Sequence, residues 1–266
     1  MKRLMGLAGM AVLLVAAAPA DILIAPGRPD AMVALEAGRK PAEVLAQSLI
    51  KPGARVMDVM AGQGYYTELL ARHVGPKGRV IAIEPVNYME DPKTAAAWTA
   101  LQKRNRNVEL VVGAPGEAAM PDKLDAAFYH LTYHDLYWQS EKFKYPRTNV
   151  DAYNARLFQA LKPGGVLAVE EHRADPRPEV PGVTDGYVSV ATVVAAAEKA
   201  GFKLDAQSEI NANPEDTKDH PFGVDTLAPT RLTAPRGEPA DPAFDRSKYD
   251  AIGESDRMTL KFRKPE

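Results

Sequence analysis

The chain has 266 residues, of which 45% are hydrophobic and 26% are charged, with a formal net charge of −2. A chain of this length can bury the core of one large domain, and its slight acidity argues against nucleic acid or an anionic membrane surface as a partner. Because the sequence contains no cysteine, disulfide bonds are excluded, which suits an oxidising compartment.

Residues 1–20 read MKRLMGLAGMAVLLVAAAPA, which has the three-part layout of a secretory signal peptide. Two cations are followed by an apolar run and by Ala18-Pro19-Ala20, so we expect cleavage after Ala20 and a periplasmic or secreted protein. The apolar run is shorter than the roughly 20 residues that span a bilayer, so we expect no stable membrane insertion after cleavage. The mature chain would have 31 basic and 35 acidic residues, a formal charge of −4.

The next segments are expected to be an arm and a helix. Residues 21–40 are mixed in character and interrupted by Pro26 and Pro29, which is typical of an arm laid over a domain. Residues 41–50 place a proline in the first turn and apolar residues at helical spacing, which predicts an amphipathic helix.

The most informative stretch lies between Ala54 and Pro85. A short apolar run from Arg55 to Met60 predicts a strand, and the small residues of 61–64 predict a tight turn. Apolar residues at helical spacing follow until 75–78, Gly-Pro-Lys-Gly, where the helix must end. Val80 to Ile83 is wholly apolar, as buried parallel strands are, and an acidic residue follows it.

This strand–turn–helix–strand order is typical of a nucleotide site. Glycines at the turn let the backbone approach a ligand, and Glu84, twenty positions after Gly64, could accept hydrogen bonds from a ribose. A dinucleotide fingerprint requires a third glycine at position 67, where the chain has threonine. The dinucleotide interpretation is therefore weakened.

Strands and helices continue to alternate along the rest of the chain, which predicts an α/β fold. We expect a doubly wound, mostly parallel seven-stranded sheet in a three-layer αβα arrangement. The further strands are predicted at 108–112, 125–131, 166–169, 203–210 and 257–262, and the further helices at 93–103, 151–161 and 190–200.

Residues 211–255 interrupt this alternation and are called the Pro-rich insertion below. They contain six prolines and little periodicity, and structureless segments of this length are uncommon in compact domains unless they are functional. Two interpretations are open: a lid over the carboxyl ends of the strands, or a surface wrap without a role in binding.

The glycine turn also fits a second motif, D-x-G-x-G-x-G, in which Asp58, Gly62 and Gly64 match and Met60 replaces the first glycine. With RKPAEVLAQSLIKPGARVMDV, YHDLYW, ALKPGGVLAVEEH and DRMTLKFRKP, the chain resembles an exported predicted class I S-adenosylmethionine-dependent methyltransferase-like family over most of residues 38–266. The resemblance implies a Rossmann-like methyltransferase fold with S-adenosyl-L-methionine as cofactor.

The resemblance also assigns cofactor-binding residues and exposes two departures from the pattern. Met60 places a flexible thioether where close backbone approach is expected, and Ala114 stands where many methyltransferases have an acid that binds the adenine amino group. Glu117 could substitute for that acid. The expected cofactor-binding residues are Asp58, Gly62, Gly64 and Glu84.

A second group of polar residues follows the predicted fourth and fifth strands, whose carboxyl ends should be neighbours. We expect His134, Asp135, Glu171 and His172 to converge on one cleft, with the catalytic residues being His134, Asp135 and His172. His134 or His172 could remove a proton from the methyl acceptor, and the aromatic residues of 133–138 could form a substrate wall or contact the sulfonium.

Two other interpretations of the histidines stay open. His130, His134 and His172 could form a metal site, although their spacing alone does not distinguish it, and no metal site is assigned. In the simplest interpretation they are hydrogen-bonded or surface histidines. Asp219-His220-Pro221 in the Pro-rich insertion is a weak further candidate, and His73 suits the carboxyl end of its helix.

Two functions follow. The first is transfer of a methyl group from S-adenosylmethionine to a small-molecule acceptor. The alternative is a non-catalytic binding protein of the cell envelope that keeps the fold with a degraded cofactor site. Export away from the cytoplasm, where the cofactor is made, favours the alternative, as do Met60 and Ala114.

Overall fold

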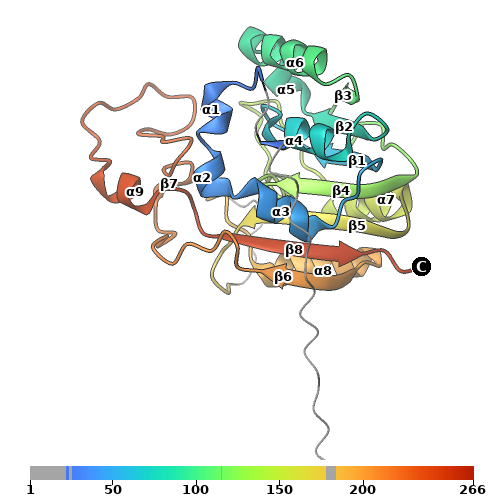
Figure 1. Ribbon diagram of the computed structural model, residues 1–266. Coiled ribbons are helices and arrows are strands. Elements are labelled where there is room, and N and C mark those ends of the chain that lie inside the picture. Colours follow the sequence, from blue (N-terminus) through green and yellow to red (C-terminus); the bar gives the residue numbers. More distant parts are fainter. Residues whose placement is uncertain (1–21, 24–25, 115, 178–183) are drawn as a thin grey trace, which may run out of the picture.

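The fold is built on one seven-stranded sheet (Figure 1). The computed structural model describes residues 22–23, 26–114, 116–177 and 184–266. The strand order is β3-β2-β1-β4-β5-β8-β6, and every pairing is parallel except those of β8. The predicted fold class is confirmed. The strands are β1 (Arg55–Val59), β2 (Arg79–Glu84), β3 (Val108–Val112), β4 (Leu124–His130), β5 (Leu161–His172), β6 (Lys203–Ser208) and β8 (Arg257–Arg263).

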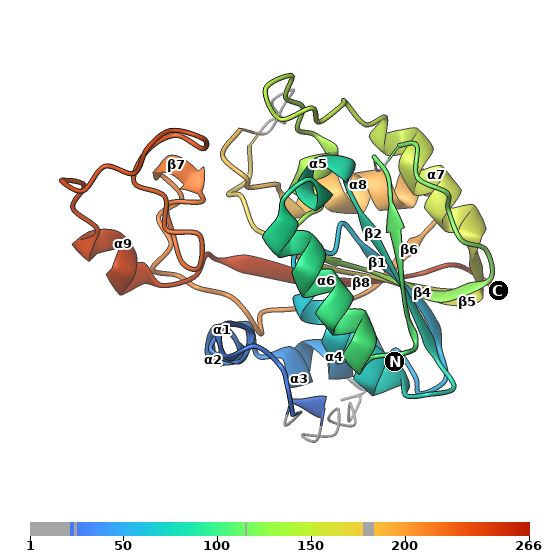
Figure 2. The same cartoon turned by 90° about the horizontal axis from the view of Figure 1, so that it is seen from above.

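Helices cover both faces of the sheet, which makes the three layers (Figure 2). One apolar cluster joins the sheet to α3, α4 and α6, and another joins it to α7 and α8. The helices are α1 (Asp30–Val33), α2 (Glu36–Arg39), α3 (Pro41–Ser48), α4 (Tyr65–Val74), α5 (Val86–Met89), α6 (Pro92–Arg104), α7 (Val150–Ala160), α8 (Val190–Ala200) and α9 (Ser247–Ile252).

Local sequence signals set the ends of several elements. The Asp91 side chain accepts hydrogen bonds from the first backbone N–H groups of α6, and a proline stands in that helix's first turn. The α4 helix begins after Gly64 and ends before Gly75. Both glycines have a positive φ, 79° and 69°, which glycine adopts more readily than other residues. The β1 and β2 strands are buried almost throughout because helices cover both of their faces.

The strand order reverses between β1 and β4, since β2 and β3 lie on one side of β1 and the later strands lie on the other. In open α/β sheets, ligands bind outside the carboxyl ends of the strands at such a reversal. The parallel strands β1, β2, β4 and β5 all end at this edge. The fold therefore selects the loops after these strands as the site.

The Pro-rich insertion lies on the side of the molecule where the parallel strands end, opposite the chain's carboxyl terminus (Figures 1 and 2). It contains a short strand, β7 (Pro221–Val224), and α9, so the expected lack of regular structure is wrong for these two parts. The Asn211 side chain donates to the Arg39 carbonyl over 3.2 Å, and Arg39 is paired with Glu254 at 3.6 Å. The insertion is thus fastened to α2.

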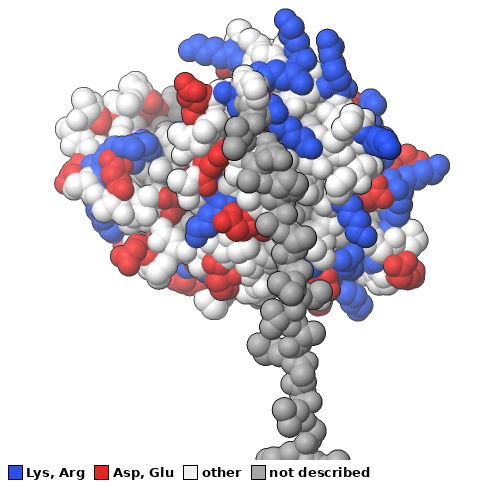
Figure 3. All heavy atoms as spheres, viewed as in Figure 1, with Lys and Arg blue, Asp and Glu red and all other residues white. Residues whose placement is uncertain are grey.

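Charges of both signs cover the visible surface, with Lys and Arg side chains gathered near α6 in Figure 3. Among the described residues, no helix is long and apolar enough to cross a membrane. The expected signal peptide, residues 1–20, lies outside the described residues, so export stays a prediction.

Candidate functional site

The turn after β1 brings three left-handed residues close together. Met60, Gly62 and Gly64 have φ values of 52°, 59° and 79°. A side chain at Gly64 would meet Leu101 of α6, whose Cδ1 lies 2.5 Å from the ideal Cβ position, so Leu101 would have to move. Beside Gly62 the same position is open, with nothing within 4 Å. The backbone at Gly62 is therefore accessible to a ligand.

Glu84 is joined directly to this turn. The Gly62 N–H donates to Glu84 Oε2 over 2.8 Å, although the two residues come from the ends of different strands. Burial raises the pKa of the Glu84 carboxyl to about 9, against the lowering effect of the Gly62 hydrogen bond. At neutral pH Glu84 can therefore donate one hydrogen bond as well as accept others, which suits a ribose hydroxyl pair.

Asp58 lies behind the turn. Its carboxylate accepts a 2.5 Å hydrogen bond from the Thr67 hydroxyl at the start of α4, and burial raises its pKa to about 7. The Trp98 indole donates to the Gly62 carbonyl over 3.2 Å. Asp58 therefore stabilises the turn through Thr67. This threonine stands where a dinucleotide fingerprint would have its third glycine.

A pocket of about 160 Å³ lies beside the residues that follow β2. Ligand pockets for drug-sized molecules usually have about 300–1,000 Å³, so this one accommodates one end of a nucleoside. Both Ala114 and Glu117 line it, which keeps Glu117 available as the acid that Ala114 cannot supply. The other lining residues follow β2 or come from the loop before α7, namely Pro85, Val86, Asn87, Lys144, Tyr145 and Pro146.

Met60, which replaces the first glycine of the methyltransferase motif, contacts a residue that lines this pocket. The Tyr145 hydroxyl donates to the Met60 sulfur over 3.1 Å, and both side chains are buried. Met60 therefore packs against a pocket wall that sequence reasoning missed, since Tyr145 is 85 positions away. The thioether thus supports the pocket through Tyr145, and Met60 is not among the residues that line it.

The second group of polar residues converges at the ends of β4 and β5. His134 begins a single 3₁₀ turn, His134–Leu136, and its Nδ1 lies 3.0 Å from Glu171 Oε1. Its Nε2 lies 3.5 Å from Asp135 Oδ1, and its ring centre lies 5.5 Å from that of His172. The structure thus brings together the four residues that the sequence places in one cleft, and their catalytic role stays a prediction.

Glu171 holds this cleft in shape. It is fully buried, and its two oxygens accept hydrogen bonds from the backbone N–H groups of Tyr133, His134 and His172. A carboxylate offers about four acceptor positions, so Glu171 fixes the backbone after β4 as well as the His134 ring. Sequence reasoning placed Glu171 in the cleft without this anchoring role, because backbone donors leave no mark in a sequence.

The two histidines have opposite charge states. Burial lowers the pKa of His134, but the carboxylates of Glu171 and Asp135 outweigh it and raise the pKa to about 9. Burial and the neighbouring His134 hold the pKa of His172 well below its usual range. At neutral pH His134 is therefore a cation, whereas His172 is neutral and its Nδ1 lies 2.5 Å from the Ser255 hydroxyl.

The Pro-rich insertion forms one wall of the cleft. Gly186 lies against both His134 and β7, since an ideal Cβ there would be 3.7 Å from His134 Nε2 and 2.3 Å from Val224 Cγ1. Next to Val224, Asp225 pairs with Arg236 at 2.6 Å, and both charges act on the pKa of Asp135. These contacts support the interpretation of the insertion as a cover over the strand ends.

Three other histidines lie outside the cleft. His130 packs on Tyr66, with its Nε2 3.7 Å from Glu170, so the metal trio that includes it is not assembled. His220 is held by Asp216 at 2.7 Å within the insertion. The remaining one, His73, lies 2.6 Å from the Ile50 carbonyl near the end of α4.

The aromatic wall is also only partly as expected. Tyr133 is fully buried, and its hydroxyl accepts a 2.8 Å hydrogen bond from Asn154, so it is a core residue. Trp138 packs on Tyr145 at 4.9 Å between ring centres and thereby stands behind the cofactor pocket.

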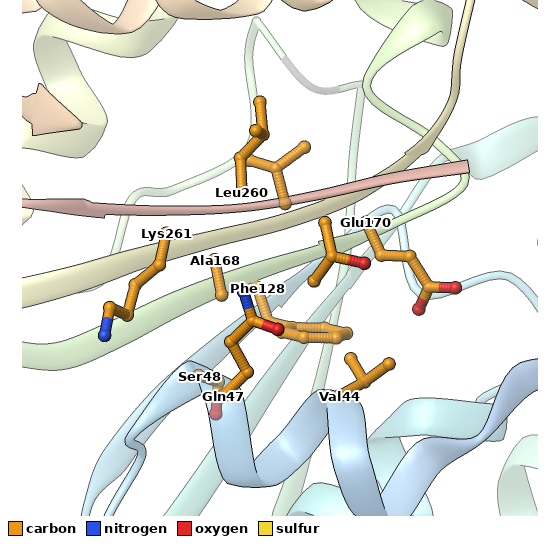
Figure 4. A pocket seen from close by; sticks show the side chains of 10 residues that line it. Val44, Gln47, Ser48, Phe128, Ala168, Glu170, Leu260 and Lys261 are labelled. Atoms are coloured by element: carbon orange, nitrogen blue, oxygen red, sulfur yellow. The ribbon is translucent and has the colours of Figure 1, made fainter. Parts of the chain in front are cut away.

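Another small pocket lies between α3 and the sheet (Figure 4). Its volume of about 10 Å³ is close to the minimum for one water molecule. Glu170 stands at one end and Lys261 at the other, with apolar side chains between them. A pocket of this size does not hold a substrate.

Comparison with known proteins bears on the half of the chain that holds the glycine turn. Residues 36–122 match the family model of protein-L-isoaspartate(D-aspartate) O-methyltransferase. A protein-L-isoaspartate O-methyltransferase of Aeropyrum pernix is 34% identical over 122 residues, which are 45% of this chain and 39% of that protein. One from Triticum aestivum is 30% identical over 47% of this chain and 49% of its own length. The chain thus spans less than half the length of these curated relatives.

Solved structures extend the likeness to the whole sheet. A S-adenosylmethionine-dependent methyltransferase from Aquifex aeolicus is 25% identical, with 69% of this chain and 93% of that one covered and a TM-score of 0.52. The [4+2]-cyclase SpnF shares the fold at 18% identity and a TM-score of 0.56, with 86% of this chain and 82% of that one covered.

These findings show the class I S-adenosylmethionine-dependent methyltransferase fold, and the cofactor is S-adenosyl-L-methionine. The residues present fit it: the space beside Gly62 is open, the buried Glu84 carboxyl is bonded to the Gly62 N–H, and Glu117 lines the pocket that follows β2. The comparisons leave the roles of Asp58, Gly62, Gly64 and Glu84 as predictions.

Proposed function

We propose that this protein transfers the methyl group of S-adenosylmethionine to an oxygen atom of an acceptor. The observation that carries the proposal is the Gly62–Glu84 hydrogen bond at the ends of β1 and β2, which joins a carboxyl suited to a ribose to the open backbone of the glycine turn. When bound, the cofactor supplies an electrophilic methyl group. The relatives named as isoaspartate O-methyltransferases support oxygen as the atom that receives it.

Fewer observations bear on the kind of acceptor. The relatives' names describe transfer to protein isoaspartate, but the matching family model ends at residue 122, before β4 and the cleft. The half that would bind the acceptor is built here from β4, β5 and the Pro-rich insertion. We therefore propose an acceptor with an anionic or ionisable oxygen, carried by a small molecule or by a protein segment.

The cleft residues would position that oxygen. His134 is cationic at neutral pH and partly exposed, and Glu171 fixes its ring by the 3.0 Å contact at Nδ1. It can therefore attract an acceptor anion, whereas it acts as a base only after it loses its proton. The neutral His172 beside it can accept a proton without that prior step.

The alternative, a binding protein without catalysis, also has support. Met60 keeps a non-glycine residue in a left-handed conformation at the turn, and Ala114 removes an acid from the pocket. The likeness to a [4+2]-cyclase is a reminder that this fold is used for reactions other than methyl transfer. The alternative needs a bound small molecule other than S-adenosylmethionine, whereas methyl transfer needs both the cofactor and an acceptor.

Calorimetry with S-adenosylmethionine and its demethylated product tests the cofactor site. Loss of a buried hydrogen-bonding group costs about 1.5–3 kcal/mol, so Glu84→Ala should weaken binding roughly 10- to 150-fold. The matched control is Glu109→Ala, since Glu109 lies on β3 with a half-exposed side chain paired to Arg79. If neither compound binds the wild-type protein, the proposal fails.

A further inference from the structure

The cleft contains a set of side chains with the composition of a metal site. His134, Glu171 and His172 each offer one ligand atom, and these atoms all lie within 4.8 Å of one another. Ions bound by imidazole and carboxylate have bond lengths of about 2.0–2.2 Å, so ligand atoms of one ion lie about 3–4 Å apart. The 3.0 Å contact between His134 and Glu171 already has this spacing, and His172 needs a shift of about 1 Å.

The surroundings of the two rings resemble the second layer of contacts around metal-binding histidines. Such a histidine usually gives its other ring nitrogen to a carboxylate, carbonyl or hydroxyl, which fixes the ring. His172 Nδ1 lies 2.5 Å from the Ser255 hydroxyl, so its Nε2 is left for an ion. For His134, the supporting carboxylate is Asp135, 3.5 Å from Nε2, which leaves Nδ1 beside Glu171 for the ion.

The site is accessible and has room on one side. The His134 and Asp135 side chains are 14% and 22% exposed, whereas Glu171 is fully buried. The opening does not extend to Gly186, because Val224 Cγ1 lies 2.3 Å from the ideal Cβ position there. An ion held here would therefore keep open positions for a ligand that enters from solvent.

We propose that His134, Glu171 and His172 bind a divalent transition-metal ion such as Zn²⁺, Mn²⁺ or Fe²⁺, with Asp135 as an adjacent carboxylate. Two imidazoles and one carboxylate are donors that these ions accept with positions left open. This inference rests on the proposed function for its purpose: the ion would hold the acceptor's oxygen anion at the ends of β4 and β5. On this proposal His134 is a metal ligand that releases a proton when the ion binds, so its cationic state belongs to the metal-free protein.

The test uses Co²⁺ alone as the probe, added to purified protein that has been freed of metal with a chelator. Cobalt bound by nitrogen and oxygen ligands gives visible absorption bands, so we expect them to saturate at about one equivalent. His172→Gln should abolish the bands. Ser255→Ala should weaken Co²⁺ binding about 10- to 100-fold, as loss of such supporting contacts does.

The control is His73→Gln, because His73 lies at the far end of α4 and should leave the titration unchanged. Thermal unfolding with and without Co²⁺ accompanies each variant, so a variant that fails to fold is recognised by its melting curve and replaced by His134→Gln. Wild-type protein without bands or a melting shift at millimolar Co²⁺ overturns the proposal. Bands that survive in both folded histidine variants overturn it as well.

The titration is independent of the proposed function because it needs neither cofactor nor acceptor. Cobalt binding without S-adenosylmethionine binding would keep the metal site and reject methyl transfer. Cofactor binding by protein that binds no Co²⁺ would reject the metal site and keep methyl transfer.

Discussion

Several ionisable groups at this site keep a proton at a pH at which the same groups in an unfolded chain would have released it. Burial raises the pKa of Glu84 to about 9 and that of Asp58 to about 7. The pKa of His134 is raised to about 9 by its carboxylate neighbours in spite of burial. Strongly shifted groups gathered at the ends of parallel strands are what a functional site would show.

These shifts predict how stability depends on pH. The unfolded chain releases the Glu84 proton near pH 4.5 and the His134 proton near pH 6.5, whereas the folded protein keeps both up to about pH 9. Folding therefore takes up protons between these values, and the free energy of unfolding should fall from pH 7 to pH 9. Each such proton contributes a slope of about 1.4 kcal/mol per pH unit.

Urea denaturation at pH 7, 8 and 9 and constant ionic strength measures this slope. Glu84→Gln removes one of the protons, so its stability should fall less steeply with pH than that of the wild type. Glu109→Gln, on the exposed side of β3, is the control and should keep the wild-type slope. Equal slopes in all three proteins would show that Glu84 is ionised in the folded state.

Residue by residue, the sequence predicted what local spacing encodes. The glycine turn and Glu84 are found at the ends of β1 and β2 because the motif is continuous along the chain. Tyr145 at the pocket and the backbone donors to Glu171 depend on segments that meet only in the folded protein. No local pattern carries that information.

At the scale of the elements, the contact between the Pro-rich insertion and the cleft forms one side of the site. The β7 strand comes close to the 184–188 loop, where the Val224 N–H donates to the Asp185 carbonyl over 2.8 Å. This approach depends on Gly186, which has a φ of 78° and no side chain to meet Val224. Gly223 is equally tight from the β7 side, since an ideal Cβ there would lie 2.2 Å from the Asp185 carbonyl oxygen. Glycines on both sides therefore allow β7 to lie against this loop.

Gly186→Ala should therefore destabilise the protein by about 1–3 kcal/mol, from backbone strain and from the overlap with Val224. Urea denaturation measures the loss. Gly75→Ala is the matched control, because Gly75 also has a positive φ of 69° but nothing within 4 Å of its ideal Cβ. Adding Val224→Ala to Gly186→Ala should recover the difference between the two. If Gly186→Ala costs no more than Gly75→Ala, the insertion does not press on the cleft.

The sequence predicted the alternating elements well and the irregular ones poorly. The helix at 190–200 and the strand at 108–112 have the predicted bounds. The helix buries Val193 and Ala197, four residues apart, and the partly buried strand is rich in valine, which favours strands. The β5 strand instead begins at Leu161, within the segment expected to end a helix. In the insertion, β7 and α9 are too short to show a period, and their positions depend on packing.

At the scale of the whole molecule, the chain combines two halves with different relationships. Residues 36–122 match a methyltransferase family model and include β1, β2 and the glycine turn. The later half supplies β4, β5, the polar cleft and the Pro-rich insertion. The family model thus covers the glycine turn and Glu84 and ends before the polar cleft.

The central claim is methyl transfer to oxygen, and its most direct test follows labelled methyl from S-adenosylmethionine into acceptors. The panel contains carboxylate and hydroxyl metabolites and a peptide with an isoaspartyl residue, with and without added divalent metal. We expect the label in one acceptor class as an ester or ether. His134→Ala should lower turnover about 10²-fold with cofactor affinity nearly unchanged, whether His134 acts as a base or as a metal ligand. Tight cofactor binding with no labelled acceptor, or full turnover by His134→Ala, would contradict the account.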